Sequence, residues 1–168
     1  MNRLDFDSGW PLPDDVLLEL GRMTALWPSL EGCVNLAIGK LMGYSELLDY
    51  RSVIVLAHSN FQQRVDIFSS LCEQLTPDYP NLAEYKSVLK LINSVQKGRN
   101  KYAHNPISMD ENDEYSVSYA SARGTLKTTV EIVRLNDIKE VTAKIHEACC
   151  ALHSLVTQKK LRPMWERK

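Results

Sequence analysis

Apolar residues recur every three or four positions along most of this chain, which is the spacing of one buried face of an α-helix. Pro28 is expected to break or kink the first helix, and Gly43 to end its second piece. Asn81 and Asn136 are placed to cap two later helices. The sequence therefore predicts four or five amphipathic helices, over residues 14–27, 30–42, 51–75 (starting near Ser45), 81–104 and 136–156.

The spacing of apolar residues changes once along the chain, from every three or four positions to every second position. Residues 115–120 alternate apolar and polar side chains, and residues 129–134 are rich in β-branched types. Arg123 and Gly124 lie between them, so the sequence predicts a β-hairpin at about 114–134. An isolated hairpin is marginal in water, so it must either pack on the helices or pair with another chain, and its edge is a candidate dimer element. The predicted fold class is all-α, an antiparallel four- or five-helix bundle with this hairpin inserted before the last helix.

One domain is expected, because 168 residues suffice for a single core. Residues 1–13 are predicted to form an N-terminal arm, since a glycine and two prolines oppose a helix there. Residues 14–160 form the helical domain, and residues 161–168 a basic C-terminal tail that contains Trp165. A basic stretch with an aromatic residue can hold single-stranded RNA, but such tails are more often solvated, and both interpretations stay open.

Charge and composition narrow the class of protein. The formal net charge is −1, so no general positive field marks a nucleic-acid binder, and any RNA contact must be local. The four cysteines have no metal-binding spacing and His146 and His153 lack a partner ligand, so reduced thiols and no metal or other cofactor are expected. The N-terminus lacks signal-peptide features, and no apolar run is long enough for a membrane helix. A cytoplasmic location and no membrane partner are predicted.

The candidate functional site is the polar stretch over residues 97–106, at the end of a strongly apolar helix. Arg99 carries a permanently charged planar fork suited to phosphate, and His104 lies where the helix dipole favours its protonated form. Pro106 should end the helix at about His104. On a continuous helix Arg99 and His104 point about 140° apart, so one copy is a poor catalytic pair unless the last turn unwinds. Two copies across a two-fold axis solve this problem.

Two neighbouring features bear on this site. Gly98 lies inside the same helix, where glycine is about 1 kcal/mol less favourable than alanine. We therefore expect a close approach of another backbone, or of a ligand, beside Arg99. The acidic loop over residues 110–114 repels phosphates and is expected to lie away from any RNA cleft.

The six residues at 99–104, Arg-Asn-Lys-Tyr-Ala-His, resemble the arginine–polar–variable–histidine motif of the HEPN superfamily. The general architecture predicted for residues 14–160 is similar to that family as well. The resemblance implies an all-helical domain that acts as a homodimer. It also implies a metal-independent endoribonuclease, a hydrolase that cleaves RNA through attack of the ribose 2′-hydroxyl.

The resemblance implies roles for individual residues. His104 acts as general base or general acid, Arg99 stabilises charge on the phosphate, and Asn100 positions one of them. The substrate-binding candidates that accompany these three are Lys97, Lys101 and Tyr102.

Two alternatives stay open. The same residues can serve a non-catalytic nucleotide-binding or protein-interaction module of the same family, or the motif can be coincidental, with His104 merely ending a helix. The candidate partners are a second copy of the chain, RNA or a nucleotide, and an antitoxin-like protein, as in toxin–antitoxin or defence systems.

Overall fold

The computed structural model describes residues 10–44, 49–121 and 124–167. Most of the predicted arm, the helix start near Ser45, the turn residue Arg123 and the last tail residue Lys168 lie outside these ranges. The chain divides into two compact units. The sheet unit combines the described part of Met1–Ala25 with Gln96–Ala143, and the helical unit combines Leu26–Val95 with Lys144–Lys168.

The first helix, α1, runs without interruption from Asp14 to Leu41. Of the predicted break or kink at Pro28, the break is therefore wrong. A proline inside a helix removes one hydrogen bond. Here the neighbouring apolar side chains outweigh that loss, because Trp27 and Leu30 are both buried. The Trp27 ring also packs on Phe61, with 4.6 Å between the ring centroids.

The long apolar segment predicted as one helix is two: α2 (Tyr50–Leu56) and α3 (Phe61–Leu75). Asn60 separates them by capping α3. Its side chain accepts a hydrogen bond from the Gln63 backbone nitrogen at 3.0 Å, and the Gln63 side chain accepts one from the Asn60 backbone nitrogen at 2.8 Å. This reciprocal pair satisfies two backbone donors that a helix start otherwise leaves without partners.

Replacing Asn60 with alanine is expected to lower the free energy of unfolding by about 1 kcal/mol, because the cap is lost. Urea unfolding followed by circular dichroism measures the change. Asn81→Ala is the matched control, since Asn81 lies within a 3₁₀ turn that has no side-chain cap. An equal effect of both substitutions contradicts the capping role of Asn60.

The later helices differ from prediction mainly at their starts. Residues Pro80–Glu84 form a 3₁₀ turn, and α4 begins only at Tyr85 and ends at Ala103, so the predicted cap at Asn81 is wrong. The last helix, α5, spans Leu135–Thr157. Asn136 therefore lies inside it, and the backbone nitrogen of Arg134 donates to the Asp137 carboxylate instead. A second 3₁₀ turn, Met164–Glu166, follows α5.

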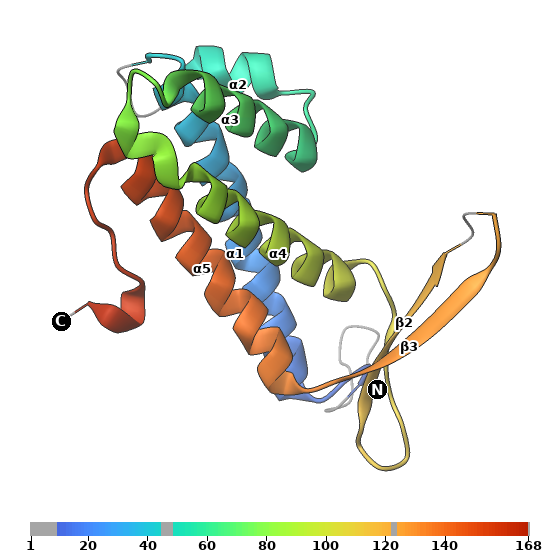
Figure 1. Ribbon diagram of the computed structural model, residues 1–168. Helices are drawn as coiled ribbons and strands as arrows, with labels where there is room; N and C mark the ends of the chain where they lie inside the picture. Colours follow the sequence, from blue (N-terminus) through green and yellow to red (C-terminus); the bar gives the residue numbers. More distant parts are fainter. Residues whose placement is uncertain (1–9, 45–48, 122–123, 168) are drawn as a thin grey trace. The chain divides into compact units, whose positions relative to one another are not determined.

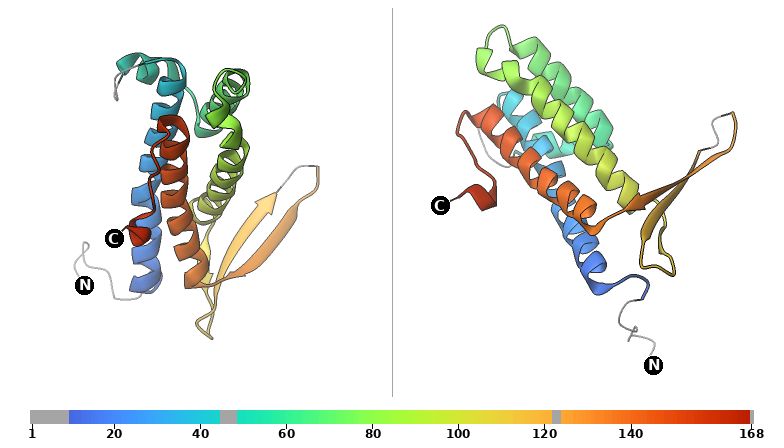
Figure 2. Two further views of the ribbon diagram at one scale, coloured as in Figure 1. Left: turned by 60° about the vertical axis from the view of Figure 1, so that its left-hand side comes forward. Right: turned by 60° about the horizontal axis from the view of Figure 1, so that its bottom comes forward.

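The sheet unit contains three antiparallel strands in the order β1-β2-β3, which are Ile107–Met109, Tyr115–Ser121 and Lys127–Val133. The predicted hairpin is present as β2 and β3, which run side by side in every ribbon view (Figures 1 and 2). The predicted all-α class is wrong, because β1 adds a third strand directly after Pro106. Three residues are too short for an alternating pattern to be recognised in a sequence.

One face of this sheet belongs to the core of its unit. Val117 and Val133 are buried, and Val117 lies opposite Glu131 in the antiparallel register. Alternate residues of a strand share a face, so Glu131 and Val133 point to the same side as Val117. None of the described helices has both the length and the apolar character needed to cross a bilayer.

Candidate functional site

The last turn of α4 carries the predicted motif and ends in a defined way. Ala103 is the last helical residue, and the backbone nitrogen of His104 still bonds to the Asn100 carbonyl at 3.2 Å. The Asn105 side chain then donates to the carbonyls of Asn100 and Lys101, at 3.3 and 2.9 Å. The bond to Lys101 satisfies a carbonyl that has no partner within the helix, and the bond to Asn100 adds to the one from His104. Asn105 therefore fixes where the chain leaves the helix.

Arg99 and His104 meet within one copy of the chain. Arg99 Nη1 lies 3.0 Å from His104 Nε2. The expected separation of about 140° assumes that His104 continues the helix. It does not, because the helix ends at Ala103 and His104 sits in the bend that follows. A second copy of the chain is thus not needed to bring these two groups together.

Asn100 completes a three-residue cluster around the same guanidinium nitrogen. Its side-chain oxygen accepts a hydrogen bond from Arg99 Nη1 at 3.2 Å. A guanidinium can only donate, so His104 Nε2 must accept in this arrangement. An imidazole that accepts at Nε2 is neutral and carries its proton on Nδ1. The cluster thus holds a basic nitrogen beside a fixed positive charge, and His104 itself is exposed.

Lys101 points away from this cluster, toward the sheet. Its ammonium lies 2.5 Å from a Glu131 carboxylate oxygen, and the Tyr119 hydroxyl donates to the other oxygen of Glu131. The hydrogen bonds from Lys101 and Tyr119 lower the pKa of Glu131, and the bond from Lys101 has the larger effect. The bond between Tyr119 and Glu131 also raises the pKa of Tyr119. Most of the charge that Lys101 offers to a phosphate is therefore offset by Glu131.

The other two predicted substrate-binding residues differ in their exposure. Tyr102 is only 7% exposed, and burial, with smaller effects of nearby carboxylates, raises its pKa to about 12. Its ring belongs to the core of the sheet unit, so it is not placed to contact a ligand. Lys97 is exposed and lies two residues before Arg99. The accessible positive charges of the motif are thus those of Lys97 and Arg99.

Gly98 marks a close contact between α4 and α5. A Cβ atom added to Gly98 would lie 2.7 Å from Val141 Cγ2, which is shorter than real Cβ contacts. The close approach expected at this glycine therefore exists, and its partner is a valine side chain rather than a backbone or a ligand. This contact holds the residue next to Arg99 against α5.

The remaining polar candidates lie in the helical unit. The described tail folds back onto α5. The backbone nitrogen of Leu161 donates to the Ser154 hydroxyl oxygen at 2.9 Å, and the backbone nitrogen of Met164 donates to His146 Nε2 at 3.0 Å. Trp165 packs on the His146 ring, with 5.4 Å between centroids. The tail is therefore not simply solvated. Within the described ranges, no group of three or more His, Cys, Asp or Glu side chains could hold a metal ion.

Two residues that shape the site, Glu131 and Val141, lie outside the predicted stretch, and the capping role of Asn105 within that stretch was not predicted. A signal existed for Asn105, because asparagine before proline at a helix end is a common stop. Nothing in the local pattern pairs Glu131 with Lys101 or Val141 with Gly98, because both contacts join distant parts of the chain.

No protein-family model matches this chain, and neither a curated protein nor a solved structure matches it.

Proposed function

We propose that this protein is a metal-independent endoribonuclease of the HEPN type, whose reacting groups are His104 and Arg99. The single observation that carries the proposal is the 3.0 Å contact between Arg99 Nη1 and His104 Nε2 at an exposed helix end. It places a proton acceptor beside a fixed cation, the two groups that RNA cleavage by the 2′-hydroxyl needs. The match of residues 99–104 to the HEPN motif supports the same function.

The reaction follows from the bonds of the cluster. A substrate phosphate competes for the Arg99 guanidinium, because a charge-assisted bond to phosphate is stronger than one to a neutral imidazole. His104 Nε2 is then free to take the proton of the ribose 2′-hydroxyl. The 2′-oxygen attacks the phosphorus, and the bond to the 5′-oxygen breaks as that oxygen takes a proton from water. The product strand ends in a 2′,3′-cyclic phosphate.

The cluster also supplies charge where the transition state develops it. Arg99 faces the phosphate oxygens and stabilises their added negative charge. Asn100 keeps the guanidinium in place through its side-chain oxygen, 3.2 Å from Nη1. Lys97 adds local attraction for the RNA backbone. The chain has a net charge of −1, so the protein as a whole does not attract RNA, and the attraction must come from these local positive charges.

The direct test incubates the purified full-length chain with mixed RNA in EDTA and analyses the product ends by mass spectrometry. We expect cleavage with 2′,3′-cyclic phosphate ends, and none of DNA, which lacks the 2′-hydroxyl. Intact RNA under these conditions contradicts the proposed reaction.

A second function is favoured by a specific observation. Arg99 bonds to His104, and Asn105 bonds to carbonyls of α4. These bonds also stabilise the end of α4, and this structural role explains the residues without any catalytic function. A non-catalytic module that binds RNA or a nucleotide through Arg99 and Lys97 has the same geometry. Binding of RNA that is weakened by Arg99→Ala, with no cleavage by the unmodified chain, supports this function instead.

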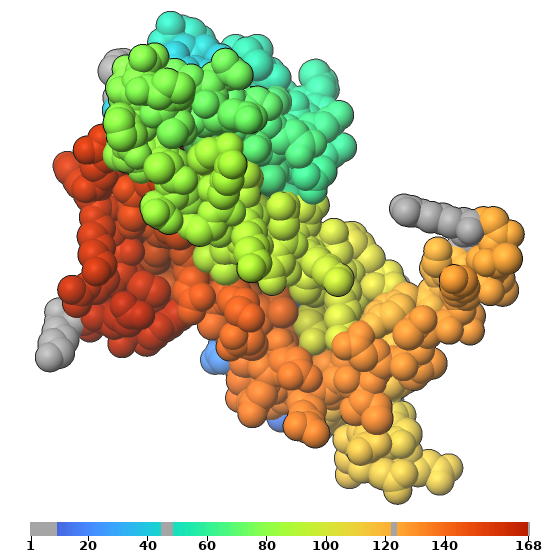
Figure 3. Space-filling view, in the orientation of Figure 1, coloured from blue at the N-terminus to red at the C-terminus, as the bar shows by residue number. Residues whose placement is uncertain are grey.

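The proposed enzyme is a homodimer, and strand β3 is its proposed contact. β3 is an edge strand of the sheet within the described residues, and its outer-face residues Val130 and Ile132 are 67% and 63% exposed. The side chains of β3 form part of the orange surface in the space-filling view (Figure 3). An edge of this kind presents unpaired backbone groups that a second chain can bond.

The charges of β3 fit pairing with itself. If two copies pair antiparallel with Thr129 on the two-fold axis, Lys127 of each copy lies opposite Glu131 of the other. Opposite charges directly across a pair of strands are stabilising. Glu131 and Lys101 lie on the same side of the sheet, and a two-fold axis perpendicular to the sheet preserves sides. Both copies of the α4 end therefore lie on one face of the joined sheet, as a shared RNA surface requires.

Thr129→Cys is expected to form a disulfide between two copies, because directly opposed residues have Cα atoms about 4.5–5.5 Å apart. Peptide mapping by mass spectrometry under non-reducing conditions detects it. Thr128→Cys is the matched control, since Thr128 lies opposite Val130 of the second copy and does not meet itself. If the Thr129→Cys chain sediments as a monomer and forms no disulfide at the substituted position, the β3 contact is contradicted.

A further inference from the structure

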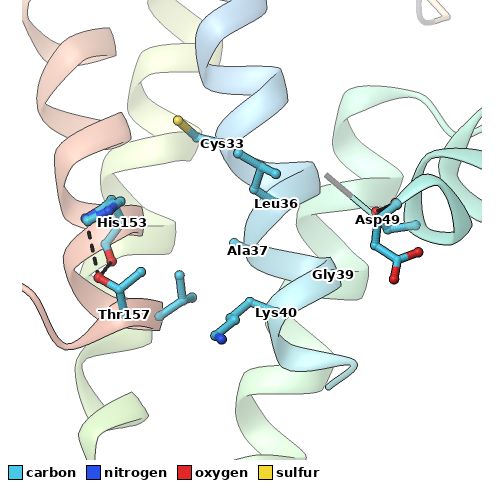
Figure 4. Close-up of a pocket in the computed structure, with 10 residues that line it drawn as sticks. Cys33, Leu36, Ala37, Gly39, Lys40, Asp49, His153 and Thr157 are labelled. Atoms are coloured by element: carbon cyan, nitrogen blue, oxygen red, sulfur yellow. Dashed lines mark hydrogen bonds between the residues drawn. The ribbon is translucent and has the colours of Figure 1, made fainter. Parts of the chain in front are cut away.

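The helical unit contains a cavity that opens to solvent. Its volume is about 200 Å³. Its lining comes from the C-terminal half of α1, the start of α2 and the last turns of α5 (Figure 4). All of the lining residues belong to the helical unit, and none belongs to the motif at the end of α4. The cavity is therefore a separate site.

The cavity has an apolar interior and a charged opening. Ala37 and Gly39 of α1 are buried, and Val156 of α5 is half-buried, so these residues form the interior. Leu36 and Lys40, which also line the cavity, are exposed and therefore lie at the opening. A ligand that fits this arrangement has an apolar body and one polar end.

Several polar side chains of the lining already have partners within the protein. The Thr157 hydroxyl donates to the His153 carbonyl oxygen at 2.7 Å, and its oxygen lies 3.4 Å from His153 Nδ1. The Ser52 hydroxyl donates to the Asp49 carbonyl oxygen at 2.8 Å. A hydroxyl that is already bonded gains little from a ligand, because the ligand only exchanges one hydrogen bond for another.

Two lining residues carry a full charge, Asp49 and Lys40. The two carboxylate oxygens of Asp49 accept hydrogen bonds from Arg51, at 2.9 Å from Nε and 2.5 Å from Nη2, so this charge is balanced inside the protein. Among the described residues, Lys40 has neither a hydrogen bond nor an ion pair of its side chain. In the close-up it extends from α1 toward the side on which His153 and Thr157 lie (Figure 4). The charge available to a ligand is therefore the Lys40 ammonium.

We propose that this cavity binds a small monocarboxylate of about the size of benzoate, with its apolar body against Ala37 and Val156 and its carboxylate on the Lys40 ammonium. An apolar cavity of about 150 Å³ holds one benzene molecule, so a cavity of about 200 Å³ accommodates a ring and one carboxylate. A hydrogen bond between an ammonium and a carboxylate is stronger than one between neutral groups. This inference does not depend on RNA cleavage.

The test titrates the ¹⁵N-labelled full-length chain at pH 7 with benzoate, benzyl alcohol and benzylamine, and follows the amide signals by NMR. These probes have nearly the same size and are negative, neutral and positive. We expect benzoate to bind with a Kd of about 1 mM or tighter, a typical affinity for so few atoms. Benzyl alcohol should bind about tenfold more weakly, because the charge-assisted bond is lost. Benzylamine should bind more weakly still.

The same titration locates the bound probe. The amide signals that move with benzoate should include those of Ala37, Lys40 and Thr157. Three results overturn the proposal: no binding of benzoate at about 10 mM, tighter binding of benzylamine than of benzoate, or shifts confined to residues outside the lining.

Substitutions of Lys40 test the charge directly. Lys40→Met keeps the apolar stem, so it should weaken benzoate about tenfold and leave benzyl alcohol unchanged. Lys40→Arg keeps the charge and should still bind benzoate. Lys90→Met is the matched control, since Lys90 is an exposed lysine of α4 in the same unit and does not line the cavity. If Lys40→Met binds benzoate as tightly as Lys90→Met does, the ammonium is not the partner and the proposal is overturned.

Discussion

Replacing His104 with alanine is expected to lower the rate of metal-independent RNA cleavage by about 10²–10⁴-fold, the range for removal of a positioned general base. The fold should be unaffected, because His104 is exposed and lies outside the helix. Cleavage of a fluorescent RNA in EDTA measures the rate, and thermal unfolding checks the fold. Arg99→Ala is expected to lower the rate by about 10²–10³-fold, since it removes a charge aimed at the phosphate.

His58→Ala is the matched control for this experiment. His58 is also exposed and also lies just after a helix, in the segment that joins α2 to α3. We expect this variant to cleave RNA at the unmodified rate. Equal cleavage by the His104→Ala chain would remove the motif from the mechanism and assign the activity to another site or to a contaminant.

The residues of the candidate site could be predicted from the sequence, but their contact could not. Arginine, asparagine and histidine near a proline are visible as chemistry at the end of an apolar helix. Whether Arg99 reaches His104 depends on whether the helix ends at residue 103 or 104, because one residue rotates a side chain by about 100°. Propensity patterns locate helix ends only to within a few residues.

The fold shows the same limit in three places. Pro28 favours a helix break locally, but burial of Trp27 and Leu30 carries α1 through it. Asn60 interrupts an apolar run because it caps α3. In the sequence it cannot be told from other polar residues unless the capping partner Gln63 is recognised three positions later. Strand β1 is stabilised by its pairing with β2, and its three residues are too few to show an alternating pattern in the sequence. Each difference arises where a specific contact overrides the local pattern.

Enlarging Gly98 is expected to have the largest effect on stability. Gly98→Leu should lower the free energy of unfolding by about 2–3 kcal/mol, because a side chain there overlaps Val141 and forces α4 away from α5. The valine cannot easily yield, since a β-branched side chain has few rotamers in a helix. Urea unfolding measures the loss. RNA cleavage should fall as well, because Arg99 is the next residue and moves with the helix.

Gly21→Leu is the matched control, because Gly21 lies in α1 and no atom of the described residues is within 4 Å of a Cβ added there. Its substitution should be neutral, or stabilising by up to about 1 kcal/mol, since leucine is the better helix former. A cavity at the partner position should restore the Gly98→Leu chain, so the double variant with Val141→Ala is expected to recover most of the lost stability. Such a recovery shows energetic coupling between the two positions. If Gly98→Leu is as harmless as Gly21→Leu, then α4 and α5 do not approach closely beside Arg99.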